Sequence, residues 1–241
     1  MNSSRAERIV IKKFLAVSGL ALTSLAASAD IGASWIDGLV NTGAGLAGGV
    51  VDTHYAFSSV SGTATGTDGY GVVTGVVRPV PAWVANTATS AWLTPSANAA
   101  ASYDRASSGL YKWTLTFDLT GFDAATASFA GRWAADDSGY IKLNGNTIET
   151  GSRKSNWTDF SAAQGFVSGV NTLDFFVTNL PHPVSSPTGL RVEFLSSSVS
   201  APQPPVPHLP APVLAVPEPS SSVMILAGLL VVGAVARRRI C

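Results

Sequence analysis

The spacing of apolar residues between positions 30 and 199 limits the fold more than any other feature of the sequence. The clearest run covers residues 110–119, where apolar and other side chains alternate over ten positions. No segment of this region keeps the helical period of about 3.6 residues for three turns. Alternation in twos is typical of strands with one buried face, and Gly, Asn, Asp and Pro separate the runs. The pattern therefore predicts an all-β body.

Further strand-like runs follow at short intervals. Asn144-Gly145 is the dipeptide best suited to a type I′ turn, which predicts a hairpin of residues 140–143 and 146–148. The other expected strands are 125–133, 158–160, 165–167, 171–179 and 188–194, with a strand-like stretch at 70–77. This spacing predicts one β-sandwich or jelly-roll domain over 30–199. Its part 30–108 is looser and glycine-rich, and it either completes the sandwich or stays partly mobile.

The charges of the body limit its partners. Residues 30–199 carry 8 Lys and Arg against 13 Asp and Glu, a net charge of −5. A mildly acidic body argues against nucleic acid, because phosphate binding needs a basic face. The single cysteine, Cys241, is the last residue and is assigned no role. Since the chain cannot form an internal disulfide, its core must stabilise it.

The first 29 residues have the three zones of a secretory signal peptide. Basic residues between Arg5 and Lys13 precede an apolar run at 14–22. Ala27 and Ala29 then form the A-x-A pattern that signal peptidase cleaves. We therefore expect cleavage after Ala29 and export of the chain. An uncleaved anchor is the alternative, although the run is short for a membrane span.

The C-terminus has a second three-part arrangement. Pro217-Glu218-Pro219 precedes a hydrophobic helix expected over 220–236, and Arg237, Arg238 and Arg239 follow. The apolar residues 223–236 would rise about 21 Å as a helix, which with the preceding serines comes close to spanning a membrane core of roughly 30 Å. The arginines would stay cytoplasmic, leaving the Pro-Glu-Pro motif just outside the membrane. A membrane-embedded processing enzyme could reach the motif there.

This tail, residues 216–239, resembles the PEP-CTERM sorting signal. The resemblance implies processing by an exosortase in a Gram-negative bacterium that makes exopolysaccharide. It also implies a transient stay in the inner membrane and a final place in the cell envelope or extracellular matrix. A permanent single-span anchor is the alternative.

A proline-rich linker over 200–219 precedes the tail. It holds eight of the 14 prolines of the chain. Such a segment favours extended polyproline II structure, which acts as a semi-rigid spacer. We expect it to separate the body from the membrane and to expose the cleavage motif.

Part of the body has a recognisable order of motifs. Asp136-Asp137, the Asn144-Gly145 hairpin and the strand Gly169-Val170-Asn171-Thr172-Leu173 follow one another. This order resembles galactose-binding-like jelly-roll domains, in which a D…NG hairpin and a G-x-N-x-L strand recur; the resemblance covers Gly109–Phe194. It implies adhesion to carbohydrate or protein, and often a structural calcium ion.

Two sets of residues are candidates for a binding site. Calcium takes six to eight oxygen ligands, and Asp136, Asp137, Asn144 and Glu193 could supply several. A plain turn at Asp136-Asp137 is the alternative. Trp133, Tyr140 and Trp157 are candidates for stacking on a sugar ring, and burial in the core is the alternative for each.

The sequence predicts no catalytic residues. The three histidines are far apart, and the chain has no G-x-S-x-G, H-E-x-x-H or P-loop motif. The predicted function is that of an exported, non-catalytic surface or matrix protein whose β-sandwich contacts exopolysaccharide or another surface protein. A secreted hydrolase of an unrecognised class is the alternative.

Overall fold

The computed structural model describes residues 33–203, together with Ile225, Leu229, Leu230 and Ala234. The predicted signal peptide and sorting signal, and the linker after residue 203, lie outside the residues described, apart from the four isolated positions, which are helical. No helix among the described residues is long and apolar enough to cross a membrane.

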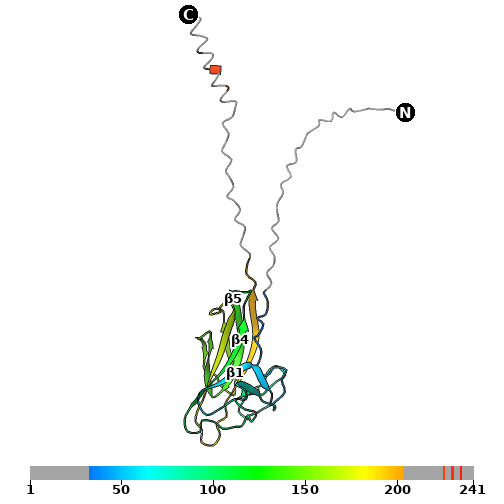
Figure 1. The fold of residues 1–241 in the computed structure, drawn as a ribbon, viewed down its shortest axis with the longest axis vertical. Helices are drawn as coiled ribbons and strands as arrows, with labels where there is room; N and C mark the ends of the chain where they lie inside the picture. Colours follow the sequence, from blue (N-terminus) through cyan, green and yellow to red (C-terminus); the bar gives the residue numbers. More distant parts are fainter. Residues whose placement is uncertain (1–32, 204–224, 226–228, 231–233, 235–241) are drawn as a thin grey trace, which may run out of the picture. The chain divides into compact units, whose positions relative to one another are not determined.

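Ten strands form the described body (Figure 1). In chain order they are β1 (Val51–Ser61), β2 (Tyr70–Val73), β3 (Leu93–Thr94), β4 (Gly109–Asp118), β5 (Asp123–Asp136), β6 (Ser138–Leu143), β7 (Asn146–Thr150), β8 (Thr158–Ala162), β9 (Val170–Asn179) and β10 (Gly189–Ser200). All pairings are antiparallel, and the strand order is β7-β6-β9-β4-β1-β2-β3-β10-β5-β8. The predicted all-β class is confirmed.

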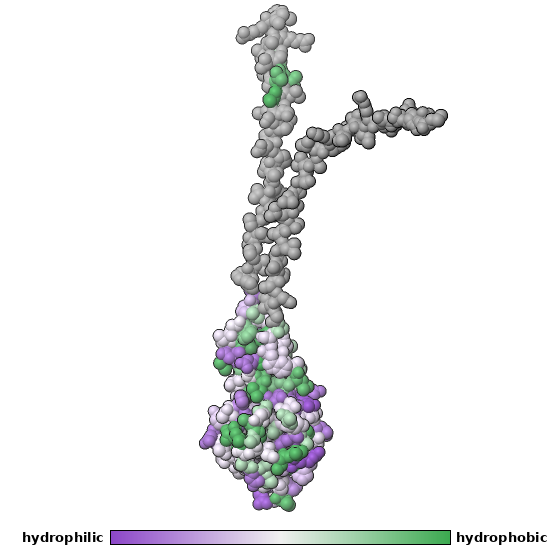
Figure 2. Space-filling view, turned by 90° about the vertical axis from the view of Figure 1, so that its right-hand side faces the viewer, coloured by the Kyte–Doolittle hydropathy of each residue, from purple (hydrophilic) through white to green (hydrophobic). Residues whose placement is uncertain are grey.

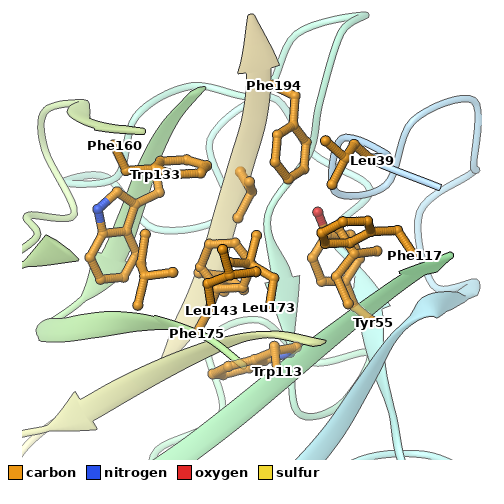
Figure 3. Packing of buried hydrophobic residues seen from close by; sticks show 14 of the residues in the cluster. Leu39, Tyr55, Trp113, Phe117, Trp133, Leu143, Phe160, Leu173, Phe175 and Phe194 are labelled. Carbon is orange, nitrogen blue, oxygen red and sulfur yellow. The ribbon is translucent and has the colours of Figure 1, made fainter. Parts of the chain in front are cut away.

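The sheet folds over on itself, so that strands far apart in the strand order pack in two layers. Trp133 on β5 lies 6.2 Å from Phe175 on β9, measured between ring centroids. Phe160 on β8 lies 6.0 Å from the same ring. Because β9 is not a neighbour of β5 or β8 in the strand order, these contacts join opposite layers. Figure 3 shows this core, and it confirms the predicted β-sandwich.

Strand β4 shows why the alternating pattern identifies the fold. Burial alternates along it, and Tyr111, Trp113, Leu115 and Phe117 are all buried on one face. Successive side chains of a strand point to opposite faces, so every second residue enters the core. Strand β4 lies between β9 and β1, near the middle of its layer.

The β6–β7 hairpin follows its turn chemistry. Leu143 pairs with Asn146, and the two turn residues have φ of 49° at Asn144 and 83° at Gly145. A type I′ turn needs positive φ at both central positions, which Asn and Gly adopt at least cost. The predicted hairpin is present.

One expected strand is absent from the described body. Residues 165–167 lie between β8 and β9 without strand pairing. The side chain of Asn171 bonds the backbone there instead: its Oδ1 accepts from Val167 N at 2.9 Å, and its Nδ2 donates to Val167 O at 2.8 Å. A side chain therefore satisfies backbone groups that the prediction assigned to a neighbouring strand.

The first half of the body supplies more structure than its composition indicated. Strand β1, which was not expected, pairs with β4 on one side and β2 on the other. Ile36 and Leu39 enter the main core. Gly48 and Gly75 touch so closely that a Cβ at Gly48 would lie 1.9 Å from Gly75 Cα. The glycines of this region therefore permit close packing.

A second, smaller core covers the outer face of β5. Trp83 and Trp92 are fully buried with Ala134, and their ring centroids are 4.2 Å apart. Exposed large apolar side chains elsewhere are scattered, and Figure 2 shows polar and apolar residues interspersed on one face of the body. The segment before β3 thus acts as a structured cover for the sheet.

Candidate functional site

A polar cavity of about 400 Å³ lies where four strands end or begin. It is bounded by Asp136 at the end of β5 and Asp137 just before β6, by Lys154 in the loop after β7, and by residues 180–187 between β9 and β10. We call it the tip pocket. Strand β10 begins beside it at Gly189, so the pocket is at the opposite end of β10 from Ser200.

Asp136 forms the buried floor of the tip pocket. It is 1% exposed, and its carboxylate accepts hydrogen bonds from Trp83 Nε1 and Lys154 Nζ, each at 2.7 Å. Thr188 donates to its backbone carbonyl at 2.8 Å. Burial, with the neighbouring Asp137, raises the pKa of Asp136 to about 7, although Lys154 acts in the opposite direction.

Asp137 connects two walls of the tip pocket. Lys154 Nζ donates to its Oδ1 at 2.6 Å, and Leu180 N donates to its Oδ2 at 2.9 Å. Burial alone would raise the pKa of Asp137, but its hydrogen bonds with Asp136, Lys154 and Leu180 hold that pKa below its usual value. Although burial opposes the charge of Lys154, the two carboxyl groups raise the pKa of its ammonium. The three side chains form one connected ionic group.

His182 and Ser185 lie on the more exposed side of the tip pocket. Ser185 N donates to His182 Nδ1 at 3.2 Å. Since Nδ1 accepts this bond, the neutral imidazole carries its proton on Nε2 and can donate from there. The pocket therefore presents donors on Lys154 and His182, acceptors on Asp137, and the hydroxyl of Ser185, which can do both.

The four predicted calcium ligands have different surroundings. Asn144 Nδ2 donates to Asn171 Oδ1 at 2.8 Å and to Gly165 O at 2.9 Å, so it braces the end of the hairpin. Glu193 on β10 is bonded to Arg132 on β5, to Arg191 on its own strand, and to Ser90 in the segment before β3. The structure thus brings together only Asp136 and Asp137 of the four, and these hold Lys154. No group of three His, Cys, Asp or Glu side chains within the described ranges is arranged to hold a metal ion.

The predicted stacking residues do not form one platform. Trp133 is 0% exposed and points inward from β5, so its proposed contact with a sugar is wrong. Tyr140 is half-buried on the outer side of β6 and stacks on Phe176, with centroids 4.7 Å apart and planes 13° apart. Trp157 is half-buried, with the guanidinium groups of Arg132 and Arg191 at 4.6 and 4.7 Å from its ring centroid. Trp133 follows the alternation of β5, so the alternative given for it, burial in the core, is the correct one.

Three important residues escaped the sequence reasoning: Lys154, His182 and Arg191. Arg191 is fully buried and donates to Ser90 Oγ at 2.7 Å, to Thr87 Oγ1 at 3.1 Å, and to the carbonyl of Ala85. It therefore holds the segment before β3 against the sheet, with Glu193 as its counter-charge. A single Arg within an alternating strand gives no sequence signal for this role.

The C-terminal segment matches a known family model. The match is to the PEP-CTERM protein-sorting motif and covers residues 215–239, which confirms the sorting tail read from the sequence. No curated protein matches the chain.

Among solved structures, the body is similar to three domains at low identity. The PA14 sugar-binding domain from an RTX adhesin has 14% identity and a TM-score of 0.28, covering 63% of this chain and 100% of its own. CBM35 from Cellvibrio japonicus Abf62 has 14% identity and a TM-score of 0.26, with coverages of 64% and 97%. Xyl-CBM35, solved with a glucuronic acid containing disaccharide, has 15% identity and a TM-score of 0.25, with the same coverages. At TM-scores this low, the similarities carry no functional argument.

Proposed function

We propose that this protein, which carries a PEP-CTERM sorting motif, is exported, cleaved at its tail by an exosortase, and retained in the cell envelope or extracellular matrix. The motif at residues 215–239 is the observation that carries the proposal. The A-x-A pattern at Ala27 and Ala29 supports entry into the export route. Signal peptidase and exosortase are then its processing enzymes, and its contact with the inner membrane is transient.

In this proposal the β-sandwich is a non-catalytic module that contacts carbohydrate. The described body exposes a polar cavity whose walls come from three loop segments, and its outer surface has few charges of either sign. Binding residues often lie on loops that a rigid scaffold holds in place, as the sandwich does here. Exopolysaccharide of the producing cell is the partner we favour.

Mass spectrometry of the protein from its native host tests the processing. The mature form should begin at Asp30 and lack Val223–Cys241, and deletion of the exosortase gene should leave the tail attached. Intact tails in a host with an active exosortase would instead indicate a permanent membrane anchor. Cosedimentation with the polysaccharide of the host tests the second part separately.

The hydrolase alternative has one observation in its favour, the adjacent carboxyl groups of Asp136 and Asp137 in a cavity. Their hydrogen bonds to Lys154, Trp83 and Leu180 account for their positions without a reaction. Incubation with the same polysaccharide distinguishes the two functions, since only a hydrolase would release shorter oligosaccharides over time.

A further inference from the structure

We propose that the tip pocket binds one neutral, polyhydroxylated sugar residue and discriminates against uronic acids. This inference rests on the proposed function, and it adds the site and the ligand class. The hydrogen-bonding groups, the charges and the apolar walls of the cavity all support it.

The polar groups of the tip pocket are of both kinds. Lys154 has three N–H donors, of which two are bonded to Asp136 and Asp137, so one remains for a ligand. His182 Nε2 is a further donor, because its Nδ1 accepts from Ser185 N. Asp137 retains acceptor capacity, since its two oxygens have about four lone pairs and its bonds with Lys154, Leu180 and Asp136 use three of them. A matching ligand must therefore donate and accept within a few ångströms.

Hydroxyl groups meet this requirement, because each one can donate and accept at once. Two adjacent hydroxyls of a sugar could donate to Asp137 and accept from Lys154 and His182. A carboxylate only accepts, so it would satisfy Lys154 but would face Asp137 without a proton to share. The donor and acceptor pattern thus favours a diol over an anion.

The charges of the pocket point the same way. Two carboxyl groups surround one ammonium group, so the pocket has no excess of positive charge. Lys154 is already paired with both carboxylates at 2.7 and 2.6 Å. Burying a uronic acid here would add a third carboxylate to the cluster, and like charges at short range disfavour the charged form.

The remaining walls suit the apolar face of a sugar ring. Leu180, Pro181 and Pro187 line the cavity, and its volume of about 400 Å³ is within the range of small-molecule sites. No Trp, Tyr or Phe is among the lining residues in the described part of the chain. Specificity would therefore come from hydrogen bonds and shape.

The test is binding of the full chain to an array of neutral hexose oligosaccharides and matching uronic acid oligosaccharides, followed by calorimetric titration of the tightest binder. We expect neutral oligosaccharides to bind at least tenfold more tightly than their uronic acid counterparts. His182→Ala and Ser185→Ala, which alter exposed side chains, and Asp137→Asn should each weaken that binding about tenfold or more. The matched control is Asp159→Asn, on the exposed side of β8 and outside the tip pocket, which should bind as the wild type does.

The outcomes separate the inference from the proposed function. Uronic acid oligosaccharides bound as tightly as neutral ones would overturn the ligand class. Neutral binding that survives His182→Ala, Ser185→Ala and Asp137→Asn would overturn the site and leave carbohydrate contact in place. Absence of carbohydrate binding by the wild type would overturn both. Melting temperatures of the variants show whether a loss of binding reflects a loss of fold.

Discussion

Trp83 donates its indole N–H to the buried carboxylate of Asp136 over 2.7 Å, which ties the segment before β3 to the floor of the tip pocket. The two residues are 53 positions apart in the chain. Both are almost fully buried, at 0% and 1% exposed. This bond joins the small second core to the pocket.

Trp83→Phe should lower the free energy of unfolding by about 1–3 kcal/mol, because a buried carboxylate oxygen loses its donor. Urea denaturation measures the change. Trp157→Phe is the matched control, since the half-buried Trp157 makes no comparable bond to a buried carboxylate among the described residues. Equal losses in the two variants would show that ring volume, rather than the hydrogen bond, matters at Trp83.

Tyr111 should make the stability depend on pH at the alkaline end. Burial, and then its hydrogen bond to Asp104, raise the pKa of Tyr111 to about 12 from 10.0. The folded state therefore disfavours the phenolate, and the contribution of Tyr111 is fully present below pH 10 and is lost as the pH rises toward 12. The free energies of unfolding of the wild type and Tyr111→Phe, measured against pH, should therefore converge over this interval. Curves that stay parallel would contradict the raised pKa of Tyr111.

Arg191→Gln should destabilise the fold by about 3–5 kcal/mol, because it leaves Glu193 buried with fewer partners and frees the segment around Thr87. Arg153→Gln, at an exposed position, should change stability by about 0.5 kcal/mol or less. Protease digestion adds a second readout, since loss of Arg191 should expose residues 84–90 to cleavage first.

The sequence prediction of calcium at Asp136 and Asp137 can be checked directly. A bound ion would add ligand contacts in the folded state only, so EDTA should lower the melting temperature and calcium should restore it. Asp137→Ala should remove the response. If EDTA leaves the melting temperature unchanged, no calcium ion is bound there, and Lys154 alone balances the charge of these carboxylates.

Glu218→Ala should leave the tail uncleaved and the protein in the inner membrane, because Glu218 is the one charged residue of the Pro-Glu-Pro motif. Deletion of Arg237, Arg238 and Arg239 should also prevent cleavage, since the basic residues fix the orientation and depth of the segment. Fractionation of the envelope followed by mass spectrometry separates these cases. Normal processing of Glu218→Ala would show that the enzyme reads other features.

The alternating strands were predictable because one buried face imposes a period of two. Strand β4 is the clearest case, with every second residue buried. Strand β1 was missed because its buried positions are unevenly spaced: Tyr55 and Phe57 are apolar, but the third is the charged Asp52, and the register with β2 shifts between Asp52 and Ala56. Pairing with β4 and β2 stabilises it, and such long-range partners are not visible in a local pattern.

The candidate site was only half predictable. Asp136-Asp137 was recognised from its turn-like composition, but Lys154 is 17 positions from Asp137 and comes from a different loop. Trp133 is buried because it occupies an inward-facing position in the alternation of β5. The residue type alone does not say which face of the strand an aromatic side chain occupies. Tertiary structure decides which polar residues meet and which aromatic faces remain outside.

The backbone pairing of Ser34 with Val199, with both N···O distances at 2.9 Å, places the two ends of the body side by side. The tip pocket lies at the other end of β10, which pairs with β5 from Gly189 to Ser200. A pulling force between a ligand in the pocket and the chain beyond Ser200 would therefore run along β10. Its hydrogen bonds to β5 would be loaded together in shear, rather than peeled apart one by one. The same strand that positions the pocket would carry the mechanical tension of adhesion.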